Sequence, residues 1–467
     1  MSTITDSDES EEAQQYDGSR VYRWLDDRLE LSDEFLGKAF PEDRYASFLL
    51  GEVTLFSFVI LVLTGTFLGL LYRPGAADVT YQGIVAEYAG SSVPVAFASV
   101  LRITYDVPMG MFIRMVHHWG AYLFIAAMGL HMFRVFFSGA YRNPRELNWV
   151  VGSILLFLGL VEGFMGYALP FDEYGSTATG IGFNLAGSIP VIGETLTKIV
   201  FGGLWPDNAS AILPRMFFYH VFLIPLVIGG LIAVHMFLLI RQKHTDQRSG
   251  RDAEADVEAS DESVVTGVPL LPNQIAVVFI VFLSTFALLS LLAGLFPVQR
   301  LPLWGPNDPF STPAGVAPDW YFMWVFGILK IVPDFVPHAE FVGGVLLPGV
   351  IAGVLVLWPF LDYKSGAVHF TADPIKRPVQ TAVGVGSIAF VIMLSIAAMN
   401  ATAAKLVGMS TGEVTSYLLY LTILVPIVWG VITYLVLKRG IERRERDSDA
   451  TPTDDDSDVA TTAVSDD

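Results

Sequence analysis

The 467-residue sequence contains no cysteine. The chain therefore offers no disulfide, no thiolate ligand for a metal or an iron–sulfur cluster, and no attachment point for a thioether-linked haem. Any metal that it holds must use histidine, carboxylate or methionine ligands. Residues 1–44 are polar and show no secretory signal pattern.

Positive charge is also scarce, because 28 Lys and Arg stand against 47 Asp and Glu and give a formal net charge of −19. Much of the acid lies in three runs, at 6–12, 246–262 and 447–467. Such runs are typical of solvated, disordered segments. The acidic composition suggests a halophilic organism, and we expect no nucleic-acid partner.

Hydrophobic residues, by contrast, make up 53% of the chain, and the mean hydropathy is +0.52. Eight apolar segments are long enough to cross a hydrocarbon core of about 30 Å. The sequence thus predicts an all-α membrane protein with eight transmembrane helices, at 47–72, 110–137, 148–169, 213–241, 270–296, 341–361, 378–400 and 415–437.

The loops on one side of these spans carry most of the 28 Lys and Arg, which predicts that this side, with both termini, is cytoplasmic. We expect a multi-pass protein of the plasma membrane. The outer loop at 170–212 reads as a folded segment with a short helix pair, and the loop at 297–340 is rich in Pro, Trp and Phe. The expected organisation is an acidic N-terminal region (1–46), a four-span core (47–241), an acidic linker (242–268), a second four-span domain (269–437) and an acidic disordered tail (438–467).

Four of the eight histidines form pairs on two predicted spans. His117 and His131 are 14 residues apart on the second span, and His220 and His235 are 15 apart on the fourth. At 3.6 residues per turn, either spacing keeps both rings on roughly one helix face, about 21–22 Å apart along the axis. Two such helices that face each other bring two imidazoles together at each of two depths, as bis-histidine haem ligation requires.

Other interpretations of these histidines compete with haem. A single membrane histidine commonly makes an interhelical hydrogen bond, and a transition-metal site needs its ligands at one depth. His118 is 13 residues from His131 and falls on the far face, so we do not expect it to be a ligand.

Arginines and glycines accompany the histidines. Arg114, Arg134 and Arg215 lie near span ends, where they can neutralise haem propionates. Snorkelling towards the interface is the alternative for Arg134. Two glycine pairs repeat the 14-residue spacing, and glycine lets a backbone approach a flat macrocycle closely. These glycines are Gly51, Gly65, Gly152 and Gly166.

Residues 25–400 resemble the cytochrome b subunit of quinol-oxidising cytochrome bc complexes. The histidine spacing carries this resemblance together with seven motifs. The front half of the chain looks like the chloroplast-type cytochrome b and the rear half like its companion subunit, here fused and with an eighth span. The motifs are TGTFLGLLY (64–72), RMVHHWGAYLFIAAMGLH (114–131), GYALPF (166–171), NLAGSIPVIG (184–193), GGLWPDNASAILPRMFFYH (202–220), NDPFSTPAGVAPDWYFMWVFGILK (307–330) and KRPVQTAV (376–383).

The resemblance implies two non-covalent haems b, with quinol and quinone as substrates. It implies that His117 and His220 ligate the low-potential outer haem, and that His131 and His235 ligate the high-potential inner one. One electron from quinol passes to a Rieske iron–sulfur protein, and the other crosses through the haems to an inner quinone site, which contributes to the proton-motive force. A c-type cytochrome or small copper protein is the implied acceptor, and the implied assembly is a homodimer within the complex.

The quartet Pro318-Asp319-Trp320-Tyr321 is similar to the family's Pro-Glu-Trp-Tyr motif, which lines the quinol-oxidation pocket. Quinol oxidation needs a base, and a partly buried carboxylate can supply one. We therefore expect Asp319 and Tyr321 to be catalytic, and Pro318 and Trp320 to contact quinol. An Asp that caps a helix after a proline is the alternative interpretation of Asp319.

Departures from the family pattern concern the inner quinone site. A histidine that mitochondrial-type chains carry shortly after the last haem ligand is absent here. Arg241, Lys243 and Asn273 are the candidates that remain. Glu162, inside the third span, can serve a proton path or pair with a neighbouring cation, and the sequence leaves this choice open.

Two other functions remain open on this basis. The chain could deliver quinol electrons to a different terminal enzyme, such as a nitrate reductase. It could also be a haem-free transporter whose histidines relay protons, although that function does not require paired spacing.

Overall fold

The computed structural model describes residues 49–242, 244–246, 264–266, 274–298, 301–308, 316–333, 335–363, 368, 371 and 373–450. Within these residues, eight helices are long and apolar enough to cross a membrane, which confirms the predicted all-α membrane architecture. The spans are α2 (Leu50–Leu71), α4 (Gly110–Ser138), α5 (Glu146–Ala168), α8–η2–α9 (Ala209–Phe218, Tyr219–Leu223 and Ile224–Gln242), α10 (Ile275–Leu295), α13–η6–α14 (Ala339–Phe341, Val342–Leu346 and Leu347–Leu361), α15 (Pro378–Ala398) and α17 (Thr411–Ala450).

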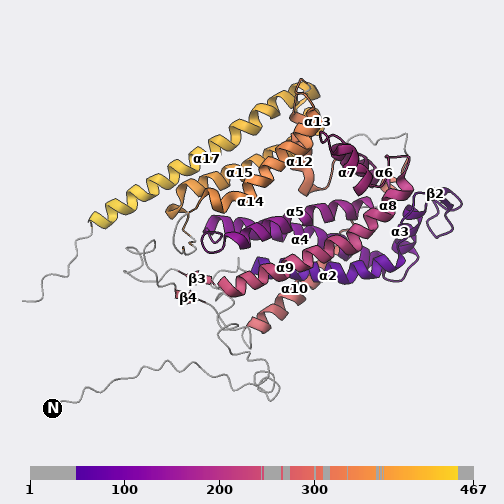
Figure 1. Ribbon diagram of the computed structural model, residues 1–467, viewed down its shortest axis with the longest axis horizontal. Coiled ribbons are helices and arrows are strands. Elements are labelled where there is room, and N and C mark those ends of the chain that lie inside the picture. The colour runs from indigo at the N-terminus through magenta and orange to yellow at the C-terminus, as the bar shows by residue number, and fades with distance from the viewer. Residues whose placement is uncertain are drawn as a thin grey trace, which may run out of the picture.

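Shorter elements gather mainly at one end of the long helices, where α3, α6 and α7 lie together (Figure 1). The predicted helix pair in the 170–212 loop is present as α6 and α7. The short helices are α3 (Val95–Tyr105), α6 (Glu173–Gly187), α7 (Gly193–Val200), α11 (Leu301–Trp304), η5 (Trp320–Phe322), α12 (Met323–Ile331), η7 (Pro374–Lys376) and α16 (Asn400–Val407). Two antiparallel pairs of strands complete the described elements: β1 (Asp78–Thr80) with β2 (Ser92–Pro94), and β3 (His244–Asp246) with β4 (Val264–Thr266).

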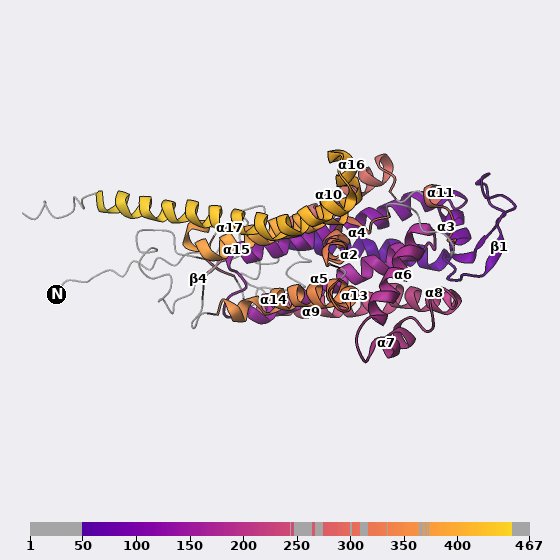
Figure 2. The same cartoon turned by 90° about the horizontal axis from the view of Figure 1, so that it is seen from above.

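The first four spans form a bundle in which α4 packs on α2 and α5 packs on α9. In the rear half, α15 packs between α12 and α17. The helix α14 rests on α5 (Figure 2). The crossing of α12 with α15 is close, because a Cβ on Gly327 would lie 1.9 Å from the backbone oxygen of Leu394. Small residues at such contacts let membrane helices approach each other.

Many large apolar side chains on the outward faces of the spans are exposed, among them Leu63, Phe279, Ile280 and Val436. Contiguous apolar surface of this kind is unfavourable in water and favourable against lipid. The helix backbones satisfy their own hydrogen bonds, as a bilayer interior demands. The exposed apolar faces therefore agree with a position in the membrane.

One predicted segment differs from the structure. The tail, predicted as disordered from residue 438, continues α17 to Ala450, because its Lys, Arg and Glu residues extend a helix that is already nucleated. Within the acidic linker, the structure describes only the paired strands β3 and β4 and residue 242, and residues 247–263 lie outside the described residues. The N-terminal region 1–46 and the tail beyond Ala450 lie outside the described residues.

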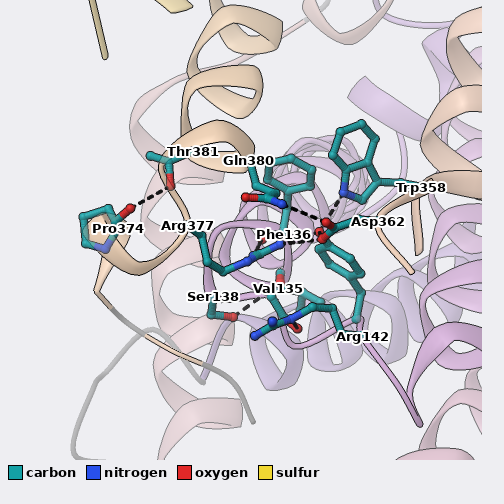
Figure 3. Close-up of polar contacts among 12 residues, drawn as sticks. Val135, Phe136, Ser138, Arg142, Trp358, Asp362, Pro374, Arg377, Gln380 and Thr381 are labelled. Atoms are coloured by element: carbon teal, nitrogen blue, oxygen red, sulfur yellow. Dashed lines mark hydrogen bonds and ion pairs between the residues drawn. The ribbon is translucent and has the colours of Figure 1, made fainter. Parts of the chain in front are cut away.

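A largely buried polar cluster joins the two halves at the end opposite α6 and α7. We call Tyr141, Trp358, Asp362, Arg377 and Gln380 the inner clamp; Figure 3 shows the last four of these residues with labels. The Arg377 guanidinium lies 2.8 Å from the Asp362 carboxylate, and Gln380 donates to the other carboxylate oxygen at 2.8 Å. Tyr141 donates to Asp362 and accepts from Arg377 and Trp358. The clamp ties the α4–α5 loop to α14 and α15.

Replacing Arg377 with Leu is expected to lower the free energy of unfolding by about 3–5 kcal/mol, because it leaves the Asp362 carboxylate, whose side chain is only 13% exposed, without its cation. Thermal unfolding of the detergent-solubilised protein, followed by intrinsic fluorescence, measures the change. Lys198→Leu, which removes an exposed pair with Glu194 on α7, is the matched control and should leave the midpoint nearly unchanged. Equal midpoints for the two variants would contradict a stabilising clamp.

Candidate functional site

The four paired histidines face each other at two depths of the front bundle. His117 on α4 and His220 on η2 have ring centres 6.2 Å apart, with ring planes at 82°. His131 on α4 and His235 on α9 have ring centres 6.5 Å apart, with ring planes at 75°. We call these the outer pair and the inner pair. Each pair joins helices that come from different parts of the sequence.

A π-helical turn explains the unequal spacing of the two histidine pairs along the chain. His220 lies in η2, whose five residues form π-type bonds within the fourth span. A π turn accommodates one extra residue in an α-helix and often marks a functional site. The 15-residue step from His220 to His235 therefore matches the 14-residue step on α4, and both pairs meet at similar distances.

Hydrogen bonds orient the rings of the outer pair. The Nδ1 atom of His117 lies 2.9 Å from the Thr64 hydroxyl, whose own proton goes to the Ile60 carbonyl at 2.7 Å. The Thr64 oxygen therefore accepts the Nδ1 proton of His117. The Nδ1 atom of His220 lies 2.9 Å from Oε1 of Glu162 and 3.2 Å from its backbone oxygen. With both Nδ1 atoms held in this way, the Nε2 atoms are left as ligands.

Each of the four predicted glycines lies against one histidine ring. A Cβ on Gly65 would lie 3.0 Å from Cε1 of His117, and one on Gly166 would lie 2.8 Å from Cε1 of His220. At the inner level, a Cβ on Gly51 would lie 3.4 Å from Cε1 of His131, and one on Gly152 would lie 3.3 Å from Cε1 of His235. Any side chain at Gly166 would thus push the imidazole out of place.

The separation of the rings fits one metal between each pair. A metal–imidazole bond is about 2 Å long, and the ring centre lies roughly 1 Å beyond the nitrogen, so two imidazoles on opposite sides of one metal have centres about 6 Å apart. The outer and inner pairs, at 6.2 and 6.5 Å, match this value. Paired neutral imidazoles are the ligand set for a haem iron held on both faces.

The predicted arginines have different surroundings. Arg114 is buried and lines the same cavity as His117. It faces Asp172, whose pKa burial raises to about 6 although the Gly175 amide and the charge of Arg114 act in the opposite direction. Arg215 instead donates to the backbone oxygens of Lys198 and Ile199 at the end of α7. Arg134 lies one turn beyond His131.

Asp319 lies among tyrosines near the outer pair. Its carboxylate accepts a hydrogen bond from Tyr122 at 2.8 Å and from Tyr321 at 3.2 Å. Asp319 precedes η5 but makes no capping bond to it, which contradicts the capping interpretation. Burial raises the pKa of Asp319, and the tyrosine hydrogen bonds partly offset this rise. Tyr321 is buried, whereas Trp320 is half exposed and Pro318 is partly buried.

A single cavity of about 230 Å³ connects these groups. The outer pair, Glu162, Asp319 and Tyr321 all line it. The sequence places Asp319 about 100 residues beyond His220, so only the packing of η5, through Tyr321, against the front bundle reveals that they share one space. An acid–base group thus lies beside the outer pair.

Other groups near the site were not predicted from sequence. No sequence pattern distinguishes Tyr122 and Thr64 from other residues of their helices as members of a site, because tyrosine and threonine are common in membrane helices. His118, which was not expected to be a ligand, packs edge-on against Tyr122 with ring centres 4.7 Å apart. Of the inner quinone candidates, Arg241 is exposed at the end of α9. Lys243 and Asn273 lie outside the described residues.

Comparison with known proteins places this arrangement in a family. Residues 122–306 match the family described as "Cytochrome b(N-terminal)/b6/petB", and residues 306–420 match "Cytochrome b(C-terminal)/b6/petD". A cytochrome bc1 complex cytochrome b subunit from Corynebacterium diphtheriae is 37% identical over 88% of this chain and 76% of its own length. Its counterpart from Streptomyces coelicolor is 34% identical over 92% of this chain and 79% of its own length.

A solved structure has the same fold. A chain of a structure titled "Hyperthermophilic respiratory Complex III" superposes with a TM-score of 0.62, covering 88% of this chain and 99% of the other at 22% identity. The sequence matches extend over both halves of the chain, including the segment that carries Asp319. The chain therefore belongs to the cytochrome b family.

Proposed function

We propose that this chain is the dihaem, quinol-oxidising subunit of a cytochrome bc-type complex. The observation that carries the proposal is the presence of two facing histidine pairs at two depths, with ring separations suited to one iron each. His117 and His220 would hold the outer haem, and His131 and His235 the inner one. When bound, the haems supply one-electron carriers at two levels of the membrane.

Around these haems, the chain supplies close backbone contact and positive charge. The four glycines leave room at the histidine rings. Arg114 at the outer level and Arg134 at the inner level would neutralise propionates. Arg215 is engaged with the backbone of α7, which makes it the weaker candidate of the three.

Quinol would bind at the outer cavity against Pro318 and Trp320. Asp319 would accept a proton from the quinol hydroxyl, since it is a buried carboxylate with a raised pKa beside the outer pair. Tyr321, whose hydroxyl already contacts Asp319, would share that proton. The inner quinone site remains proposed at Arg241, Lys243 and Asn273.

The expected partners follow from the relatives, which are named as subunits of cytochrome bc1 complexes. A Rieske iron–sulfur protein would take the first electron from quinol, with a c-type cytochrome or small copper protein as its acceptor. The chain would lie in the plasma membrane with both termini cytoplasmic, as half of a homodimer. In that orientation the haems conduct charge across the membrane and conserve energy.

Replacing any one of the four histidines with Leu should remove one haem. The two histidines of a pair should affect the same haem. His117→Leu and His220→Leu are expected to remove the same haem, because each deletes one of the two histidines that would hold it. His131→Leu and His235→Leu should remove the other. Dithionite-reduced minus oxidised spectra, with the haem-to-protein ratio, measure the result. A wild-type protein with fewer than two haems b would refute the proposal.

Gly166→Ala is expected to displace His220 and to reduce the haem content from two towards one per chain, because the added methyl group would lie 2.8 Å from the ring. Overpacking of this kind typically costs about 1–3 kcal/mol. Gly129→Ala is the matched control, since a Cβ there has no atom within 4 Å among the described neighbours. The haem ratio of the two purified variants decides whether the close approach matters.

Asp319→Asn should lower quinol oxidation by about 10²–10⁴-fold, the usual contribution of a general base. A base acts when deprotonated, so wild-type activity should rise with pH through the pKa of Asp319. That rise should lie above the ordinary range of an aspartate, because burial raises this pKa. The asparagine variant should lose the rise while retaining both haems, and Asp319→Glu should restore it. An unchanged pH profile in the asparagine variant would exclude Asp319 as the base.

A further inference from the structure

Glu162 is an intramembrane carboxyl group that the proposed function does not use. It lies on α5, one turn before Gly166, and its side chain is 18% exposed. A carboxyl group within a membrane span is costly to bury and needs a partner. Its Oε1 atom lies 2.9 Å from Nδ1 of His220, while Oε2 is buried without a hydrogen-bond partner in the described part of the chain. The carboxyl group is therefore directed at the histidine.

The four histidines differ in what holds their Nδ1 atoms. His220 has the carboxyl group of Glu162, and His117 has the neutral hydroxyl of Thr64. Among the described residues, the Nδ1 atoms of His131 and His235 are buried without a hydrogen-bond partner. A carboxyl group thus contacts one ring of the outer pair and neither ring of the inner pair.

This contrast has a direct electronic consequence for a bound metal. A carboxylate that accepts the Nδ1 proton makes the imidazole a more basic ligand at Nε2 and fixes its tautomer. A more electron-donating axial ligand stabilises ferric iron more than ferrous iron. The midpoint potential of the metal centre then falls.

We propose that Glu162 is a positioning residue for His220 that lowers the midpoint potential of the outer haem relative to the inner one. The inference rests on the proposed haem ligation by His117 and His220. Glu162 holds the His220 ring so that Nε2 faces the gap between α4 and the fourth span. It also gives the outer level a donating ligand that the inner level lacks.

The direction of this effect suits inward electron movement. An electron that passes from the outer to the inner face moves against a membrane potential that is negative inside. A lower potential at the outer haem supplies the free-energy difference for that step. Glu162 thus assists the transfer while remaining outside the quinol pocket motif at 318–321.

Redox titration of the purified complex, followed at the absorption bands of the two haems, tests this role. Glu162→Gln keeps the size of the side chain and replaces its carboxyl group with a neutral amide. The midpoint potential of the outer haem, identified as the haem that His117→Leu removes, should rise, and that of the inner haem should not move. Glu194→Gln, which removes an exposed carboxylate on α7, is the matched control and should shift neither.

An unchanged outer potential in Glu162→Gln, or an equal shift of both haems, would overturn the inference. If the glutamine variant loses the outer haem, Glu162→Ala is the second variant, because the backbone oxygen of residue 162 still accepts the Nδ1 proton. The same selective rise is expected of it. A wild-type protein without two haems would refute the proposed function, whereas two haems and no selective shift would refute only the role of Glu162.

Discussion

The structure depends on two imidazoles held about 6 Å apart across a gap, once at each of two levels of the front bundle. This spacing requires α4 and the fourth span to stay apart while they remain in one bundle. The helix α2 packs on α4, and α5 packs on α9, so each helix that carries paired histidines is supported by a neighbouring span. This packing maintains the separation. The ring distances of 6.2 and 6.5 Å show that both levels meet the same geometric condition.

Two local features make this condition possible. Glycines on α2 and α5 bring the supporting backbones against the histidine rings, so that each imidazole is confined without a bulky neighbour. The π turn at Tyr219–Leu223 absorbs one residue and aligns His220 with His117. A regular α-helix over the same 15 residues would rotate one histidine relative to its partner.

The outer level is chemically richer than the inner one. Asp319, its tyrosine partners and Glu162 all border one cavity with the outer pair. These residues come from α4, α5 and the segment before α12, so the outer cavity exists only when the rear half packs on the front half. The inner clamp performs a comparable joining function at the opposite end, through the hydrogen bonds of Tyr141 with Asp362, Arg377 and Trp358. Polar contacts therefore connect the two halves at both ends of a largely apolar molecule.

The residues that repeat along a helix were predictable from the sequence. Apolar length determined the eight spans, and helical periodicity placed the histidines and glycines at two levels. The motif around Asp319 indicated an outer carboxylate. One local prediction failed because it used composition alone: the charged tail extends α17 to Ala450.

Partners from distant helices were decided only by the tertiary structure. The contacts of Glu162 with His220, Thr64 with His117 and Tyr122 with Asp319 join residues 53 to 197 positions apart. Periodicity reports which face a residue occupies on its own helix, but it carries no information about which helix packs against that face. The sequence therefore determined where the ligands lie along each span, and the packing of spans decided what holds them and what lies beside them.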